Sequence, residues 1–160
     1  MPQYPVAGRG RMVVKSASRG TELIEKDWAT EAYTCDSPPM IQIVAQELGV
    51  GGALVLLALP ANKITTYPVK MVDRGLPTPP AAQVGVQYYG KTGAFQYQAA
   101  EGSVDIYSMD KTVSGRFAVT LRELNRNDRL AFAGSFKDVP VMALDAARCM
   151  PAAGGVTPAR

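Results

Sequence analysis

The sequence of 160 residues contains no histidine, and this absence removes several kinds of active site. A Ser-His-Asp triad, a Cys-His pair and a histidine-ligated metal centre all require an imidazole. The chain has only two cysteines, which cannot supply the four ligands of a structural zinc site. The densest acidic segment, from Glu22 to Glu31, alternates along a strand region beside basic residues and is explained as a solvated edge. We therefore expect no enzyme, no metal and no cofactor.

Long runs of one kind of residue are also missing. The longest apolar stretch, residues 48–61, is shorter than the roughly 20 residues that cross a bilayer, and it is predicted to form a turn followed by a strand buried on both faces. The net charge of +3 is too small to indicate a nucleic-acid partner. Four cations near the start of the chain have no acidic residue among them, and they predict a docking arm for an acidic protein face or an anionic membrane surface. They are Arg9, Arg11, Lys15 and Arg19.

The two cysteines, Cys35 and Cys149, lie far apart in the chain. A disulfide between them would close a loop that the chain-entropy model values at roughly 4–5 kcal/mol. Two buried thiols in a reducing compartment explain the same residues equally well, and both alternatives stay open.

Almost every ordered segment alternates apolar and polar residues, or is rich in β-branched residues, and ends at Gly, Pro, Asn or Asp within about ten residues. Val104 and Ile106 would face a core while Asp105 and Tyr107 face away. The sequence therefore predicts an all-β fold, an antiparallel two-sheet β-sandwich in a single domain. We expect a basic N-terminal arm over residues 1–19, the β-sandwich domain over residues 20–145 and an irregular C-terminal tail over residues 146–160. The only helical turn expected lies between Met142 and Cys149. The strands expected are residues 11–17, 22–25, 29–35, 40–47, 53–59, 64–72, 83–89, 94–99, 103–109, 113–124 and 129–136.

Two G-x-F units repeat in consecutive expected strands, Gly115-Arg-Phe117 and Gly134-Ser-Phe136. Glycine inside a strand often marks a close cross-strand neighbour. We expect a phenylalanine ring of one strand to cover the glycine of the next.

Several short motifs follow one another along residues 24–139: Trp28-Ala, Ile41-x-Ile43-x-Ala45, an apolar strand ending near Pro60, Tyr67-Pro-Val, then G-x-V-x-I, S-G-x-F-x-V and G-x-F. This series resembles the uncharacterised β-sandwich domains of bacterial lipoprotein-like proteins. The resemblance implies a small, exported, non-enzymatic sandwich and brings no catalytic residues. The chain departs from the pattern because Met1-Pro-Gln-Tyr-Pro shows neither a signal peptide nor a lipobox cysteine.

Tyrosine and glutamine alternate with core positions in the expected hairpin from Gln83 to Ala99, and they combine flat apolar contact with hydrogen bonding. The expected interaction face consists of Gln87, Tyr89, Gln96, Gln98, Asp105 and Tyr107. We expect a non-catalytic interaction module, an extrinsic subunit that docks through protein contacts onto a larger, membrane-associated assembly. The alternative is a β-sandwich that binds a carbohydrate or small ligand. The missing signal peptide indicates the cytoplasmic side, whereas the resemblance and a disulfide between the two cysteines indicate the extracytoplasmic side, and both stay open.

Overall fold

The computed structural model describes residues 10–16, 25–71, 76–90, 93–124 and 128–144, and over these residues its regular elements are all β-strands. The strands are β1 (Gly10–Ser16), β2 (Glu25–Asp36), β3 (Pro39–Glu47), β4 (Gly51–Ala58), β5 (Thr66–Pro68), β6 (Ala81–Gly90), β7 (Gly93–Met109), β8 (Thr112–Glu123) and β9 (Arg129–Ala143). Of the helical turn expected from Met142 to Cys149, Met142 and Ala143 belong to β9 and residues 145–149 lie outside the described part.

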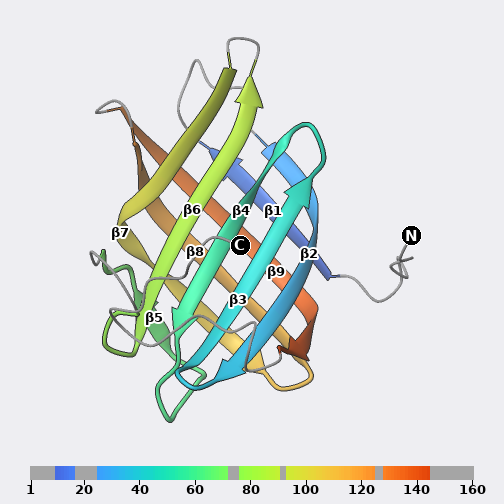
Figure 1. Cartoon of the computed structure of the whole chain (residues 1–160), viewed down its shortest axis with the longest axis vertical. Helices are drawn as coiled ribbons and strands as arrows, with labels where there is room; N and C mark the ends of the chain where they lie inside the picture. The colour runs from blue at the N-terminus through green and yellow to red at the C-terminus, as the bar shows by residue number, and fades with distance from the viewer. Residues whose placement is uncertain (1–9, 17–24, 72–75, 91–92, 125–127, 145–160) are drawn as a thin grey trace, which may run out of the picture.

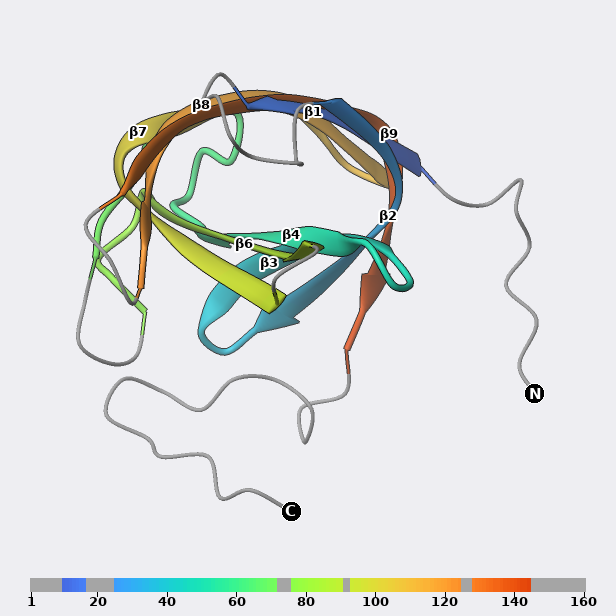
Figure 2. The same cartoon turned by 90° about the horizontal axis from the view of Figure 1, so that it is seen from above.

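Eight strands close into an antiparallel barrel, and the expected two-sheet sandwich is wrong (Figures 1 and 2). Each strand pairs with the next one along the chain, β5 excepted, and β9 returns to pair with β1. The closing register places Val14 opposite Gly134 and Met12 opposite Phe136. The alternation of apolar and polar residues cannot distinguish a barrel from a sandwich. It shows that one face of each strand is buried, but it does not show which strands pack against that face.

Strand β7 is bent, and the sheet curves into a barrel at this bend. The sequence predicted two strands here, residues 94–99 and 103–109, and the structure joins them across a bulge between Ala99 and Glu101. Gly102 follows the bulge with φ +122°, and a Cβ there would meet the carbonyl oxygen of Ala118 at 2.3 Å. A bulge raises local twist, and glycine is the residue that accepts this conformation.

The short strand β5 fills the gap that this bend opens. The first half of β7 pairs with β6, whereas Ser103–Asp105 pair with β5, and Val69 forms a bridge to Ala82 at the start of β6. Tyr67 projects from β5 into the core with no exposed surface, and its hydroxyl donates to the carbonyl oxygen of Lys63 at 2.7 Å. Its ring therefore covers the seam where β6 and β7 part.

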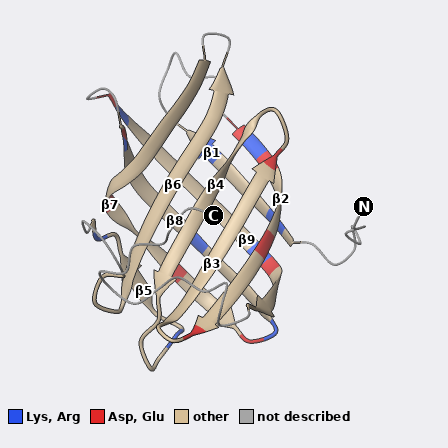
Figure 3. Ribbon diagram, viewed as in Figure 1, with Lys and Arg blue, Asp and Glu red and all other residues tan. Residues whose placement is uncertain are grey.

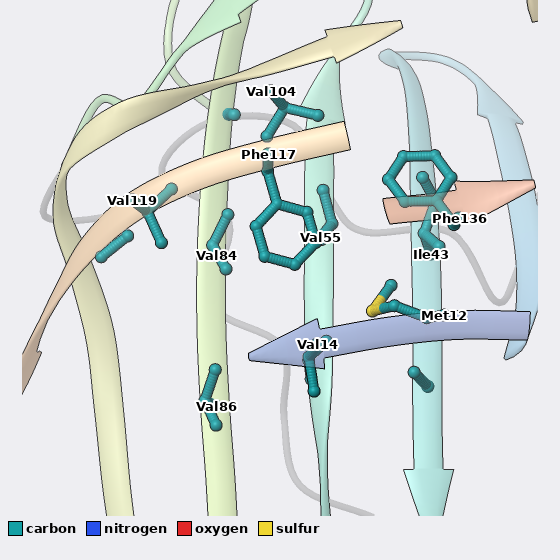
Figure 4. Close-up of a cluster of buried hydrophobic side chains, with 14 of the residues drawn as sticks. Met12, Val14, Ile43, Val55, Val84, Val86, Val104, Phe117, Val119 and Phe136 are labelled. Carbon is teal, nitrogen blue, oxygen red and sulfur yellow. The ribbon is translucent and has the colours of Figure 1, made fainter. Parts of the chain in front are cut away.

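The inward side chains form one core that fills the barrel (Figure 4). Met12 and Val14 on β1 and Phe117 and Val119 on β8 project toward side chains of the opposite wall, which are Ile43, Val55, Val84 and Val86. The rings of Phe117 and Phe132 lie 5.6 Å apart. Burial of this apolar surface is the dominant favourable term in folding.

The expected cover of glycine by phenylalanine is confirmed in both directions. Gly115 pairs with Phe136, and Phe117 pairs with Gly134, across β8 and β9. A Cβ on Gly134 would lie 2.5 Å from Cζ of Phe117, and one on Gly115 would lie 3.0 Å from Cζ of Phe136. Each ring occupies the space that a larger residue would need, which fixes the register of the two strands.

Two glycine substitutions should change stability in opposite directions. Gly134→Ala should lower the free energy of unfolding by roughly 1–3 kcal/mol, because its methyl group overlaps the ring of Phe117. Gly85→Ala should raise it by about 0.5–1 kcal/mol, because a Cβ there would meet only the carbonyl oxygen of Tyr97 at 3.8 Å and would remove backbone freedom from the unfolded chain. Urea unfolding of both variants measures the difference. Equal shifts of the same sign would contradict the packing described for Phe117.

Alkaline pH should destabilise the barrel through Tyr67. Burial raises the pKa of Tyr67 to about 12, whereas an unfolded chain loses its tyrosine protons near pH 10. Stability from this group is therefore complete below pH 10 and is lost as pH rises from 10 to 12, on the order of 2–3 kcal/mol in all. Denaturant unfolding at several pH values should show this decline, and Tyr67→Phe should show a shallower one. An unchanged slope in that variant would exclude Tyr67 as the cause.

Candidate functional site

The barrel wall has one side almost without charge. Strands β4 and β6 contain no Asp, Glu, Lys or Arg, and β3 contains only Glu47 at its end (Figure 3). These three strands are neighbours in the sheet and lie together on one side of the barrel (Figure 2). An uncharged stretch of this width is the kind of surface that enters binding sites, because charged residues are depleted from interface cores.

A groove of about 590 Å³ lies on this wall, across β3, β4, β6 and the first half of β7. Most of its side chains come from outward positions, and five residues of the core cluster also line it: Ala45, Ala53, Val84, Val86 and Tyr97. The groove therefore lies on the outer face of the wall and reaches the edge of the packed interior. The outward residues that line it are Val44, Gln46, Gly52, Leu54, Leu56, Gln83, Gly85, Gln87, Tyr89, Gln96, Gln98 and Leu124.

Strand register explains the shape of the groove. One row across the wall reads Val44, Leu54, Gly85 and Gln98 from β3 to β7. The only atom within 4 Å of a Cβ built on Gly85 is a backbone oxygen, so the missing side chain leaves the space above β6 open. The next row reads Gln46, Gly52, Gln87 and Gln96, which places a second glycine between amide side chains.

The amide groups of the groove are mostly free to bind a ligand. Nε2 of Gln87 donates to the hydroxyl of Tyr89 at 3.1 Å. Within the described residues, no hydrogen bond involves the side chains of the other groove glutamines, which are Gln46, Gln83, Gln96 and Gln98. Each amide can donate and accept, and Leu54 and Tyr89 beside them are 41% and 51% exposed. The groove thus combines unused hydrogen-bonding groups with aliphatic and aromatic surface.

The structure brings together four of the six residues expected to form an interaction face. Gln87, Tyr89, Gln96 and Gln98 all line the groove. Asp105 and Tyr107 lie on the other half of β7, beyond the bulge, and do not line it.

Asp105 and Tyr107 instead belong to a cluster with Arg116. Asp105 accepts a hydrogen bond from the hydroxyl of Thr66 at 2.7 Å and lies 3.7 Å from Nε of Arg116. The guanidinium of Arg116 stacks on the ring of Tyr107 at 5.6 Å from its centroid. These contacts make the pair part of the β7–β8 surface.

Two of the four cations expected in a docking arm stand on a barrel strand. Arg11 and Lys15 occupy outward positions of β1, between β2 and β9. Nε of Arg11 donates to the Asp27 carboxylate at 2.9 Å, and a second guanidinium nitrogen donates to the Asp27 carbonyl at 3.0 Å. Arg9 and Arg19 lie outside the described residues, as do residues 146–160 of the expected tail.

Cys35 is disulfide-bonded and lies beside the groove, on the outer face of the barrel. It packs with Met40 and Leu56, and Leu76 and Leu144 contact the same cluster. Cys149 lies outside the described residues, so the pairing of Cys35 with Cys149 stays a prediction.

Sequence reasoning missed the half of the groove that comes from β3 and β4. The apolar stretch from Leu48 was interpreted as buried on both faces, which holds for Leu56 and Ala58 but not for Leu54. Gln83, Gly85 and Gln87 alternate along β6, and this pattern of amide and glycine at outward positions was the available signal. It could not indicate which strand lies next to β6.

The interior offers little to a ligand. Tyr88, Phe95 and Tyr97 stack near one end of the barrel, with ring centroids 5.0 Å and 6.1 Å from that of Tyr88. Burial, a hydrogen bond with Tyr88 and the negative charges of Glu123 and Asp128 hold the pKa of Tyr97 well above its ordinary value. Nε1 of Trp28 is buried and has no acceptor among the described residues. Tyr88 and Trp28 belong to the packed core, Phe95 is partly buried against it, and Tyr97 also lines the groove.

In the described part of the chain, no group of three or more Cys, Asp and Glu side chains is placed to hold a metal ion. The same residues include no helix long and apolar enough to cross a membrane. No family model, curated protein or solved structure matches the chain.

Proposed function

We propose that the protein is a non-catalytic interaction module, and that the groove binds an uncharged, aliphatic-rich segment of a partner protein. The observation that supports this most directly is the charge of the site: among the described residues that line it, Glu47 is the only Asp, Glu, Lys or Arg. A charged segment would lose solvation there without gaining an opposite charge, whereas a neutral one would not.

The chemistry of the groove suits an extended chain. Its free amides, Gln83, Gln96 and Gln98 among them, can pair with the backbone groups of a peptide, and Leu54 and Leu124 offer apolar contact to its side chains. Strand β4 at the centre of the groove pairs with β3 on one side and with β6 on the other, so the segment would bind there through side chains and not by adding a strand. This role agrees with an extrinsic subunit that docks onto a larger assembly.

A peptide-display selection tests the proposal. The probe is a library of random peptides of about 12 residues, panned on the protein with prior depletion on Gly85→Leu, which fills the groove without backbone strain. Selected peptides should lack charged residues, and a synthetic one should bind Gly85→Leu at least about tenfold more weakly. Gly85→Ala should retain part of the affinity, and Tyr107→Ala, outside the groove, should bind as the unmodified protein does.

Three results would contradict the proposal: no enriched peptide, enriched peptides rich in Asp or Glu, or binding that Gly85→Leu leaves unchanged. Far-UV circular dichroism and urea unfolding confirm that the variant is folded. Because Gly85 faces outward with open space above it, we expect no loss of stability from the substitution.

A neutral oligosaccharide is the second candidate for the same groove, because the half-exposed ring of Tyr89 lies beside amides that can bind hydroxyl groups. A groove of about 590 Å³ is within the usual range for small-ligand sites. A thermal-shift screen against a glycan panel separates the two candidates. A hit that Tyr89→Ala abolishes, together with a failed peptide selection, would favour the sugar.

A further inference from the structure

The side of the barrel away from the groove carries an excess of positive charge. Outward positions of β8, of β9 as far as Lys137 and of β1 hold six cations and no acidic residue. These cations are Arg11, Lys15, Arg116, Arg122, Arg129 and Lys137, and we call this surface the cationic face. Two acids stand next to these cations on the same strands: Glu123 follows Arg122 but is buried, and Asp138 follows Lys137 at a residue with φ +53°.

Strand register brings like charges together on this face. Arg122 lies directly opposite Arg129, and Arg11 lies directly opposite Lys137. Like charges at facing positions of a sheet are destabilising. Asp27 pairs with Arg11 and Asp105 lies near Arg116, but within the described residues no ion pair involves Arg122, Arg129, Lys137 or Lys15. Lys15 lies opposite the acidic Glu25 of β2, whereas Arg122, Arg129 and Lys137 are available to an anionic partner.

The residues between the cations exclude several kinds of partner. They are mostly small, such as Ala118, Ala131, Ala133 and Ser135, and Val13 is the single larger apolar side chain, 43% exposed. A protein interface usually has an apolar centre in which aromatic or arginine side chains are buried. The described residues of this face form no such apolar centre. Within the described residues, β1, β8 and β9 carry no exposed aromatic ring, and the ring of Tyr107 beside them is already stacked on Arg116. These strands are part of the closed wall and include no helix or free ribbon that could enter a DNA groove.

We propose that the cationic face docks on a membrane surface of anionic phospholipid headgroups. Binding to such a surface requires only that several cations lie on the same face of the protein. Each cation adds to the electrostatic attraction without a pocket shaped for one headgroup. β1, β8 and β9 lie on the opposite side of the barrel from β3, β4 and β6 (Figure 2). A molecule bound to headgroups in this way leaves the groove open to a partner protein, so this second role is independent of the first.

Vesicle sedimentation tests the proposal with the full chain. The probes are phosphatidylcholine vesicles with and without about 30 mol% phosphatidylserine, at about 0.15 M salt. The protein should bind only the anionic vesicles, and more weakly as salt increases. The double variant Arg122→Gln/Arg129→Gln should bind about 25-fold more weakly, from about fivefold for each cation. It should be at least as stable, because it removes a like-charged facing pair.

The matched control is Lys63→Gln/Lys111→Gln, which removes the same charge at exposed positions outside the cationic face. It should bind the vesicles within about twofold of the unmodified protein. An equal loss in both double variants would show that net charge alone acts and would overturn the proposal. Failure to bind anionic vesicles would do the same, as would tighter binding to a DNA duplex than to vesicles at equal salt.

Discussion

The pairing of β1 with β9 is the contact on which the rest of the barrel depends. It joins the first described strand to the last, and it requires Gly134, because the ring of Phe117 occupies the space beside that residue and Val14 faces it from β1. Closing a loop of this length costs conformational entropy, which the apolar surface buried by Met12, Trp28 and their neighbours offsets. Without this pairing, β2 and β9 would meet only along the short parallel ladder from Ala32 to Thr34.

Closure of the barrel also determines how the charged side chains are distributed over its outer surface. A meander of eight strands places β3, β4 and β6 on one side and β8, β9 and β1 on the other, so each group of outward side chains becomes a separate face (Figures 2 and 3). The first face is nearly uncharged and contains the groove, and the second contains six cations. The net charge of +3 for the whole chain does not indicate that one face is nearly uncharged and the other cationic. Acidic residues such as Glu25, Asp27 and Glu31 offset the cations in the total, and they lie on β2, between the two faces.

Local order could be predicted from the sequence, and the pairing of distant strands could not. Alternation placed Val84, Val86 and Phe117 in the core and Gln87, Tyr89 and Gln98 outside, because the period of a strand depends only on the backbone. The repeat of Gly115 and Gly134 even indicated a cross-strand contact. The choice of barrel over sandwich depends on the β1–β9 register and on the bend at Gly102, which are tertiary features. The groove followed the same division: four of its residues on β6 and β7 were predicted, whereas those from β3 and β4, and Gln83 and Gly85 of β6, were missed.

A closed and filled barrel restricts where binding energy can come from. The interior is occupied by its own side chains, and the indole nitrogen of Trp28 is enclosed by the core. Strands β3 and β4 each pair with a strand on both sides, so the groove offers no edge there that could extend the sheet into a partner. The two proposals therefore assign recognition to outward side chains. Two outward positions make the sheet less stable than it could be. Glycine at position 85 leaves more backbone freedom in the unfolded chain, and Arg122 and Arg129 place like charges opposite each other. Neither feature contributes to the packing of the core. Both positions lie on the surfaces that the two proposals assign to partners.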